Sequence, residues 1–231
     1  MSFRFKQFSI QDDRCAMKVG TDGVLLGAWC PITNHQLPIT HTPLRVLDVG
    51  TGSGLIARML MQRCPEAEIE GIDIDSNAVS QAQENGVNAF CASVQEWDGE
   101  PYDLIVSNPP FFQNSLKNPD KGRQTARHTD TLSYEELIAH SARLLQENGR
   151  LALILLAEAE EEVRRLAAVH NLFLTHLTRV FSKETKPARR VLMAFVKSPI
   201  TLPVIEDTLV LEDEKGGRSL PYQELCREFY L

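Results

Sequence analysis

Residues 44–54, which read LRVLDVGTGSG, decide the fold of this chain. The apolar run predicts a buried β-strand, and the glycines after it predict a sharp turn into a helix at 53–64. Strand and helix patterns then alternate as far as residue 170, which is typical of a parallel sheet with helices on both faces. Further strands are expected at 67–74, 87–92, 102–107 and 150–156, and further helices at 76–86, 133–149 and 157–170.

The pattern changes after residue 170. Two strand-like segments, 172–182 and 190–198, are separated mainly by the polar stretch KETKPAR, and no helix fits between them. Strands joined so closely pair antiparallel. We therefore predict a Rossmann-like α/β fold, with a seven-stranded, mostly parallel sheet that ends in an antiparallel hairpin. A short strand at 208–213 and a helix at 222–230 are expected to follow.

Length and composition describe one globular α/β domain with small elaborations. The chain has 231 residues, 43% of them hydrophobic, and no apolar run long enough to span a membrane. We divide it into a cap of the ligand site at 1–43, a central domain at 44–198 and a strand–helix extension at 199–231. The N-terminus lacks the apolar core of a secretory signal, and the five cysteines form no CxxC pair. We expect a reduced, cytoplasmic protein that binds no metal and, without a long heptad pattern, is a monomer.

The glycine-rich turn at residues 50–54 predicts a ligand site. It lies at the carboxyl end of the sheet, where open α/β folds bind ligands, and the helix behind it offers N–H donors to an anion. Asp73 ends the next strand, 23 positions after Gly50, where a carboxylate can accept hydrogen bonds from ribose hydroxyls. Leu55 stands where the dinucleotide fingerprint GxGxxG has its third glycine, which disfavours a nicotinamide cofactor.

Alternatives remain for the residues around this turn. The turn itself could be purely structural. Asp48 lies beneath it and could either orient an ammonium group of the ligand or serve the fold. Asp73 could cap the next helix, although Asp75 or Ser76 suits that role better.

The second motif is Asn108-Pro109-Pro110-Phe111, which follows the strand at 102–107 and so lies at the same edge of the sheet. The Asn108 side-chain oxygen and the Pro109 carbonyl can accept both hydrogens of an exocyclic amine or an amide, which favours a pyramidal, nucleophilic nitrogen. The prolines fix the chain so that this carbonyl faces inward, and Phe111 can stack on an extruded base. A rigid structural Pro-Pro turn is the alternative.

Together, the glycine turn, Asp73 and the tetrad resemble the class I methyltransferases that use S-adenosylmethionine (SAM). The resemblance implies methyl transfer to a planar nitrogen, with the methionine carboxylate of SAM at the glycine turn. Many of these enzymes hold the SAM adenine with an acid after the third strand; here the sequence is ASVQEW (92–97), so Ser93 or the backbone at Val94 has to serve. The expected cofactor contacts in this part of the chain are Asp48, Gly50, Thr51, Gly52, Gly54, Asp73, Ile74, Val94 and Asn108.

Longer motifs resemble those of one family among these methyltransferases. They are MKVGTDGVLLGAW (17–29), VLDVGTGSGLIARML (46–60), NPPFFQNSLKNP (108–119), ARHTDTLSYEEL (126–137) and a terminal REFYL. They are similar to those of the bacterial tRNA1(Val) adenine N6-methyltransferases, which modify adenine 37, just 3′ of the anticodon. The similarity runs over essentially all of residues 1–231. It implies that Asn108, Pro109 and Phe111 hold the target adenine, and that Lys18, Gly20 and Thr21 close over the methionine end of SAM.

Two basic clusters are expected to contact the RNA partner, the anticodon stem-loop of a tRNA. The net charge of −7 and the pI near 5.4 speak against binding to nucleic acid, but a protein can be acidic on one face and basic around its active site. Solvated loops are the alternative for both clusters, and His128 is expected to be structural or to contact RNA. The first cluster is Lys117, Lys121, Arg123 and Arg127; the second is Lys183, Lys186, Arg189 and Arg190.

Three other functions fit parts of the pattern. Methylation of a release-factor glutamine uses the same tetrad, but tyrosine is more usual at position 111 and a helical domain usually precedes the sheet. Methylation of adenine N6 or guanine N2 in ribosomal RNA shares the motifs. A non-catalytic RNA-binding module that has kept the fold is the third, although the intact Asn108, Asp73 and glycines speak against it.

Overall fold

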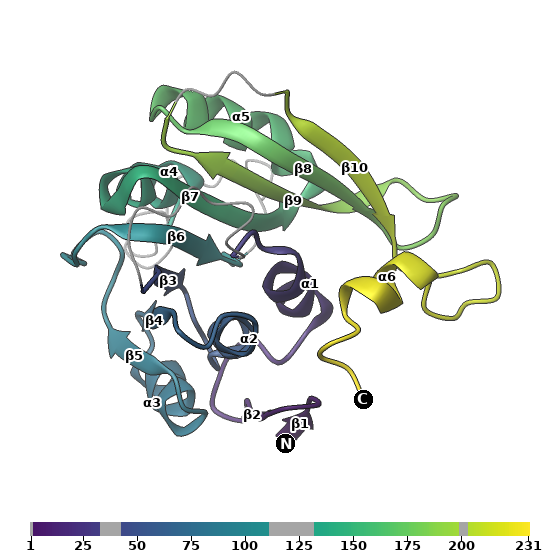
Figure 1. Ribbon diagram of the computed structural model, residues 1–231, viewed down its shortest axis with the longest axis horizontal. Coiled ribbons are helices and arrows are strands. Elements are labelled where there is room, and N and C mark those ends of the chain that lie inside the picture. The colour runs from purple at the N-terminus through teal and green to yellow at the C-terminus, as the bar shows by residue number, and fades with distance from the viewer. Residues whose placement is uncertain (1, 33–42, 111–131, 199–202) are drawn as a thin grey trace, which may run out of the picture.

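The computed structural model describes residues 2–32, 43–110, 132–198 and 203–231, and Figure 1 shows a twisted central sheet with helices on both faces. Eight strands form this sheet within the described ranges. The α/β fold class predicted from the sequence is confirmed. In spatial order the strands are β10 (Ile205–Val210), β8 (Phe173–Phe181), β9 (Ala188–Val196), β7 (Leu145–Leu156), β6 (Tyr102–Ser107), β3 (Arg45–Val49), β4 (Glu68–Asp73) and β5 (Asn88–Cys91).

The pairing of the strands follows the predicted pattern. β5, β4, β3, β6 and β7 are parallel neighbours, and β9 lies antiparallel between β7 and β8, which confirms the hairpin. β10 is an eighth member of the sheet because it pairs in parallel with β8. Polar side chains link β8 and β10 to Trp29, the last residue of the helix at Thr21–Trp29. Trp29 Nε1 donates to Thr178 Oγ1 at 2.8 Å, and the Thr178 hydroxyl donates to Asp207.

The two apolar layers follow from the alternation of side chains along the inner strands. Val46 and Leu104 face one layer, whereas Leu47 and Ile105 face the other. No helix of the described ranges is long and apolar enough to cross a lipid bilayer. The first layer is covered by α1 (Thr21–Trp29), α2 (Leu55–Arg63) and α3 (Ser76–Glu84), and the second by α4 (Tyr134–Leu144), the short η2 (Ala157–Ala159) and α5 (Glu160–Val169).

The helix predicted at 133–149 is shorter in the structure. Its start is confirmed by a capping box, in which Ser133 N donates to Glu136 Oε2 at 2.9 Å and Glu136 N donates to Ser133 Oγ at 3.2 Å. The prediction was wrong over its last turn. The helix ends at Leu144 because Leu145 already pairs with Tyr102 in the sheet, and the register then shifts across residues 146–149.

The two ends of the chain pack together (Figure 1). The hairpin of β1 (Ser2–Arg4) and β2 (Ser9–Gln11) meets the segment after α6 (Leu220–Leu225), where Lys6 N donates to Phe229 O at 2.9 Å. The rings of Phe5 and Tyr230 stack with their centroids 6.1 Å apart. Phe5 and Phe229 belong to the same apolar core as α1 and α2. The division into cap, central domain and extension stays a prediction.

Candidate active site

The glycine turn joins β3 to α2, and each of its glycines has a positive φ: 71° at Gly50, 54° at Gly52 and 80° at Gly54. A Cβ added at Gly50 or Gly52 would meet no atom within 4 Å, so both positions border open space. A Cβ at Gly54 would lie 2.6 Å from Cγ2 of Val87. Gly54 therefore serves the packing of the turn, whereas Gly50 and Gly52 shape its open side.

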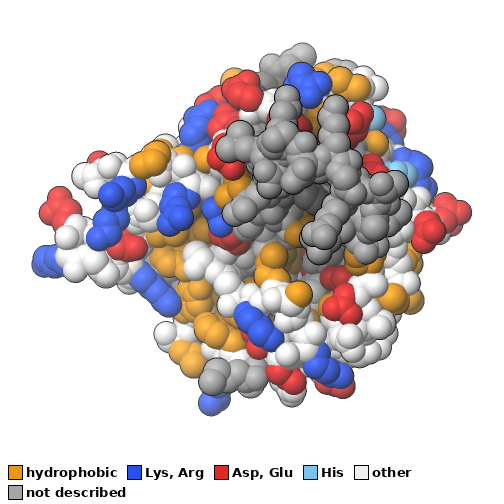
Figure 2. All heavy atoms as spheres, turned by 180° about the vertical axis from the view of Figure 1, so that it is seen from behind, with side chains coloured by type: hydrophobic (Ala, Val, Ile, Leu, Met, Phe, Trp, Pro, Cys, Tyr) orange, Lys and Arg blue, Asp and Glu red, His pale blue; other side chains and the backbone are white. Residues whose placement is uncertain are grey.

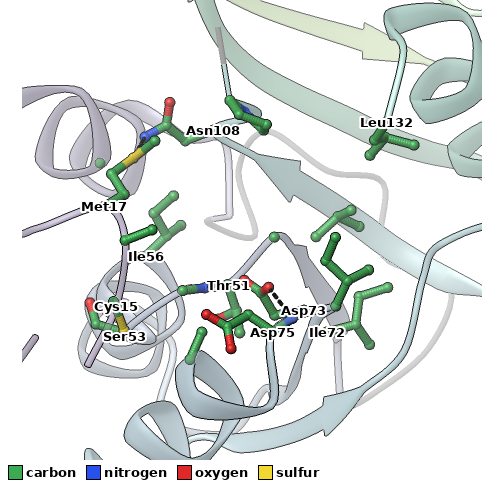
Figure 3. Close-up of a pocket in the computed structure, with 18 of the residues that line it drawn as sticks. Cys15, Met17, Thr51, Ser53, Ile56, Ile72, Asp73, Asp75, Asn108 and Leu132 are labelled. Carbon is green, nitrogen blue, oxygen red and sulfur yellow. Dashed lines mark hydrogen bonds between the residues drawn. The ribbon is translucent and has the colours of Figure 1, made fainter. Parts of the chain in front are cut away.

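A cavity of about 1010 Å³ opens beside this turn (Figure 3). Its walls come from the carboxyl ends of the parallel strands, the segment before α1 and the start of α4. The buried Asp48, Gly54 and Pro109 do not line it. The predicted residues that do are Lys18, Gly20, Thr21, Gly50, Thr51, Gly52, Asp73, Ile74, Ser93, Val94, Asn108 and Pro110.

Asp73 reaches the cavity from the end of β4. Its Oδ2 accepts from Gly52 N at 2.9 Å and its Oδ1 accepts from Asp75 N at 3.0 Å. Asp75, not Asp73, caps α3, since Asp75 Oδ1 accepts from Asn77 N at 2.9 Å. A carboxylate has about four acceptor sites, so Asp73 can still accept from a hydroxyl donor in the cavity.

Asp48 has no exposed surface beneath the turn. Its Oδ2 accepts from Thr51 Oγ1 at 2.8 Å and from Ala57 N at 3.3 Å, so it ties the turn to the first helical turn of α2. Burial is the largest effect on this carboxyl group, and it raises the pKa to about 7. Its position outside the cavity lining favours the structural alternative over direct contact with a ligand.

The segment before α1 forms one wall of the cavity and is fixed by the buried Asp12. Asp12 Oδ2 accepts from Val19 N at 2.9 Å, and the Asp12 carbonyl accepts from Lys18 Nζ at 2.6 Å. Lys18 Nζ also donates to the Asp13 carbonyl at 3.1 Å. Lys18 thus reaches the cavity with its ammonium group engaged by its own loop. The sequence reasoning missed Asp12, because only the folded loop reveals these bonds.

Four acidic residues that were not predicted as site residues also line the cavity: Asp22, Asp75, Glu96 and Glu136. Ile74, another lining residue, is 63% exposed. Ser93 Oγ donates to Glu96 Oε2 at 3.3 Å, so the serine singled out from the sequence is itself paired with an acid. Glu96 follows β5 closely within ASVQEW (92–97), and this acid after the third parallel strand was the sequence signal that could have marked it as a site residue.

Asn108, Pro109 and Pro110 follow β6 at the same edge of the sheet. Asn108 Nδ2 donates to Met17 Sδ at 3.5 Å, and Figure 3 shows the Met17 sulfur beside that nitrogen. Asn108 Oδ1 is buried, and it has no hydrogen-bond partner among the described residues. A buried acceptor without a donor is costly unless a bound group satisfies it. Phe111 lies outside the described residues.

The predicted RNA contacts divide into two groups. Lys183, Lys186 and Arg189 are exposed in or beside the turn between β8 and β9. Figure 2 shows Lys and Arg side chains mixed with acidic ones on this side of the molecule, and Lys183 Nζ lies 3.4 Å from a carboxylate oxygen of Glu212. The first cluster, Lys117, Lys121, Arg123 and Arg127, lies outside the described residues, as does His128.

Arg190 differs from its neighbours because its guanidinium is engaged within the protein. Its Nε lies 2.9 Å from Asp22 Oδ2, and both side chains are 23% exposed. The pair ties β9 to the first turn of α1. Within the described ranges no three His, Cys, Asp or Glu side chains gather as metal ligands, and the metal-free expectation stays a prediction.

The chemistry of the cavity fits SAM. Open space at Gly50 and Gly52 gives a carboxylate access to the turn. Asp73 retains acceptor capacity for hydroxyls. Ile74 and Val94 supply apolar surface for a base, and Asn108 Oδ1 is an acceptor in need of a donor.

Comparisons with known proteins agree with this chemistry. The methyltransferase small domain family matches residues 35–183. The tRNA1(Val) (adenine(37)-N6)-methyltransferase of Christiangramia forsetii is 42% identical over 244 residues, which cover 99% of this chain and 97% of that protein. The protein of the same name from Aeromonas hydrophila is 40% identical, with the same coverage of both chains.

Solved structures show the same fold at low identity. A predicted O-methyltransferase from Agrobacterium tumefaciens has a TM-score of 0.65 at 16% identity, covering 90% of this chain and 96% of that chain. The ribosomal protein L11 methylase of Lactobacillus delbrueckii has a TM-score of 0.53 at 18% identity, covering 77% of each chain. Because such a relative is 42% identical over nearly the whole length of both chains, the chain belongs to the family of bacterial tRNA1(Val) (adenine(37)-N6)-methyltransferases, as its motifs predicted.

Proposed function

We propose that this protein transfers a methyl group from SAM to the exocyclic N6 amine of adenine 37 in tRNA1(Val). One observation carries the proposal: Asn108, whose buried side-chain oxygen has no partner among the described residues, lies at the same cavity as the glycine turn and Asp73. Relatives of about 40% identity that bear the name of this activity support the choice of tRNA as substrate.

The cavity offers a contact for each part of the cofactor. Gly50 and Gly52, at the start of α2, would receive the methionine carboxylate, and Asp73 would accept from the ribose hydroxyls. Ile74 and Val94 would flank the adenine, and Lys18, Gly20 and Thr21 line the other wall. When bound, SAM supplies an electrophilic methyl group on a sulfonium centre.

The tetrad prepares the nucleophile. The lone pair of an adenine amine is delocalised into the ring, so the nitrogen attacks only when that delocalisation is reduced. Asn108 Oδ1 and the Pro109 carbonyl would accept the two N–H hydrogens and favour a pyramidal nitrogen. Pro109 and Pro110 have fixed φ angles, which hold this carbonyl in place. Phe111 is proposed to stack on the flipped base.

Proton release follows methyl transfer and requires no strong base. The methylated nitrogen is cationic, so it is acidic enough to lose a proton to water. Exposed Lys183, Lys186 and Arg189 are proposed to contact tRNA phosphates, together with the first basic cluster. Such contacts position the RNA without reading its sequence.

The test is methyl transfer from labelled SAM to an unmodified tRNA1(Val) transcript, followed by nuclease digestion and nucleoside mass spectrometry. We expect N6-methyladenosine, which should be lost when guanine replaces adenine 37 and in Asn108→Ala. Asn88→Ala, an exposed substitution on β5, is the matched control and should retain activity.

Each alternative has its own outcome in this experiment. Methyl transfer to ribosomal RNA or to a release-factor glutamine, with no transfer to tRNA, would support the proposed reaction and refute tRNA as the substrate. No transfer to any of them, together with no heat of SAM binding in calorimetry, would favour a non-catalytic RNA-binding module.

A further inference from the structure

The Met17 side chain contacts the Asn108 amide. It comes from the segment before α1, 91 positions earlier in the chain, and its sulfur lies 3.5 Å from Asn108 Nδ2. Met17 lines the cavity and is 46% exposed. Figure 3 shows the two side chains approaching from opposite elements at one end of the cavity. The contact therefore joins the N-terminal segment to the proposed catalytic tetrad.

The chemistry of this pair distinguishes the two ends of the amide. A thioether sulfur accepts a hydrogen bond and cannot donate one, whereas an asparagine amide has a donating nitrogen and an accepting oxygen of nearly equal size. Only one of the two flipped orientations of Asn108 places the N–H group on the sulfur. The other would set oxygen against sulfur and put the NH2 group in the buried position, where the described residues offer it no acceptor.

The orientation of this amide decides whether the site can hold an amine. In the observed orientation Asn108 Oδ1 is buried and has no partner within the described ranges, so its acceptor capacity is unused. In the flipped orientation the two hydrogens of the target amine would meet another donor. The hydroxyl of the neighbouring Ser107 donates to the Val49 carbonyl at 2.8 Å, so its proton is not available to Asn108 Oδ1.

The position of Met17 is itself fixed by its loop. Asp12 accepts through its carboxylate from Val19 N, and its carbonyl accepts from Cys15 N at 3.3 Å and from Lys18 Nζ. These bonds bracket Met17 on both sides along the chain. The sulfur is thus presented by a preformed loop, which lowers the entropy cost of orienting the amide.

We propose that Met17 is a positioning residue: its thioether accepts from the Asn108 amide and so turns the amide oxygen toward the target amine. The inference rests on the proposed function of the tetrad and adds to it a residue outside the tetrad. In this proposal Met17 acts on the reaction through Asn108.

Met17→Leu tests the inference, since leucine keeps a similar apolar volume and has no acceptor. We expect kcat for tRNA methylation to fall roughly fivefold, the change that corresponds to one net hydrogen bond, with KM for SAM unchanged. The side-chain NH2 resonances of Asn108, assigned in a nitrogen-15 NMR spectrum by their loss in Asn108→Ala, should shift. Met17→Gln, which restores an accepting oxygen, should recover much of the lost kcat.

Met61→Leu is the matched control. Its sulfur accepts from Arg58 Nη1 at 3.8 Å and it does not line the cavity, so kcat and the Asn108 resonances should stay as in the parent protein. Full kcat in Met17→Leu would overturn the inference, and so would a loss of kcat while the Asn108 resonances stay in place. If the parent protein methylates no RNA, the proposed function fails, but unmoved resonances in Met17→Leu would still refute the contact separately.

Discussion

Two aspartates at the carboxyl edge of the sheet have different surroundings. Asp48 is closed off beneath the glycine turn, whereas Asp73 borders the cavity and keeps acceptor sites for a ligand. Both stand at the end of a predicted strand, so the sequence could place them at one edge. It could not tell which was buried, because burial depends on how Thr51 and Ala57 fold back over Asp48.

The buried carboxyl of Asp48 predicts a pH dependence of stability. Its pKa rises from 3.8 to about 7 on folding, so the folded state holds a proton that the unfolded state releases. Its contribution to the free energy of unfolding therefore falls as pH rises from about 4 to about 7. Asparagine does not titrate, so the free energy of unfolding of Asp48→Asn minus that of the parent protein should increase when the pH is raised from about 5 to about 8. Urea unfolding at the two pH values measures this difference. An equal difference at the two pH values would contradict the assignment.

Asp73 predicts a binding effect instead. Asp73→Asn should weaken SAM binding by roughly ten- to a hundredfold, because a charged acceptor for hydroxyls is lost. Isothermal titration calorimetry measures the change. Asp98→Asn is the control, since the Asp98 side chain is 98% exposed and lies outside the cavity lining. Similar affinities in the two variants would show that Asp73 does not contact the cofactor.

Residue-level prediction worked where a rule about strand ends applied and failed where a contact joined distant segments. Asp73 and Asn108 follow buried strands, and parallel strands bring their carboxyl ends to one edge. Asp12 and Met17 carry no such signal. Their roles arise from loops whose course is set only when the fold is complete.

At the scale of elements, α1 and α2 pack unusually closely through glycine. A Cβ at Gly23 would lie 2.9 Å from Leu55 Cδ2, and one at Gly27 would lie 2.7 Å from Met59 Sδ. α2 follows the glycine turn, and the first turn of each of the two helices lines the cavity. This helix contact therefore holds two parts of the candidate site together.

Gly27→Ala should lower the free energy of unfolding by about 1–3 kcal/mol, because overpacking against Met59 outweighs the helix propensity of alanine. Urea unfolding gives the value. A double-mutant cycle with Met59→Ala should show less destabilisation in the pair than the sum of the single changes, since removing the sulfur relieves the clash. Strict additivity would argue that the two side chains do not compete for space.

Element boundaries were the weaker part of the sequence prediction. The apolar periodicity ran on through Leu145, but Leu145 pairs with Tyr102 and thereby ends α4 early. The strand near residue 208 was predicted, yet its partner was not. Its place beside β8 depends on the contacts among Trp29, Thr178 and Asp207, which bring together three separate parts of the chain.

At the scale of the whole molecule, residues near both ends of the described chain complete the same apolar core. Phe229→Ala, at a position only 2% exposed, should lower the free energy of unfolding by about 3–5 kcal/mol. The Lys6 amide, which donates to the Phe229 carbonyl, should also exchange its hydrogen faster. Leu231→Ala, at an 80% exposed position, is the control and should change neither quantity. Unaltered Lys6 exchange in Phe229→Ala would show that the hairpin is held by other contacts.

The overall architecture was predictable because it rests on patterns repeated along the chain. Alternating strands and helices gave the sheet, and the short KETKPAR connection gave the hairpin. The union of the first hairpin with the last helix was not predictable, since no local pattern links residues more than 200 positions apart.

That union also affects how the protein is made. The Lys6 side chain donates to the Arg227 carbonyl across 221 positions of sequence. While the ribosome is still adding the middle of the chain, the first hairpin has no partner for these bonds, although the sheet behind it can already assemble. For most of translation the rings of Phe3 and Phe5 therefore lack the Tyr230 ring that packs against them in the finished fold, a period in which a chaperone could bind this hairpin.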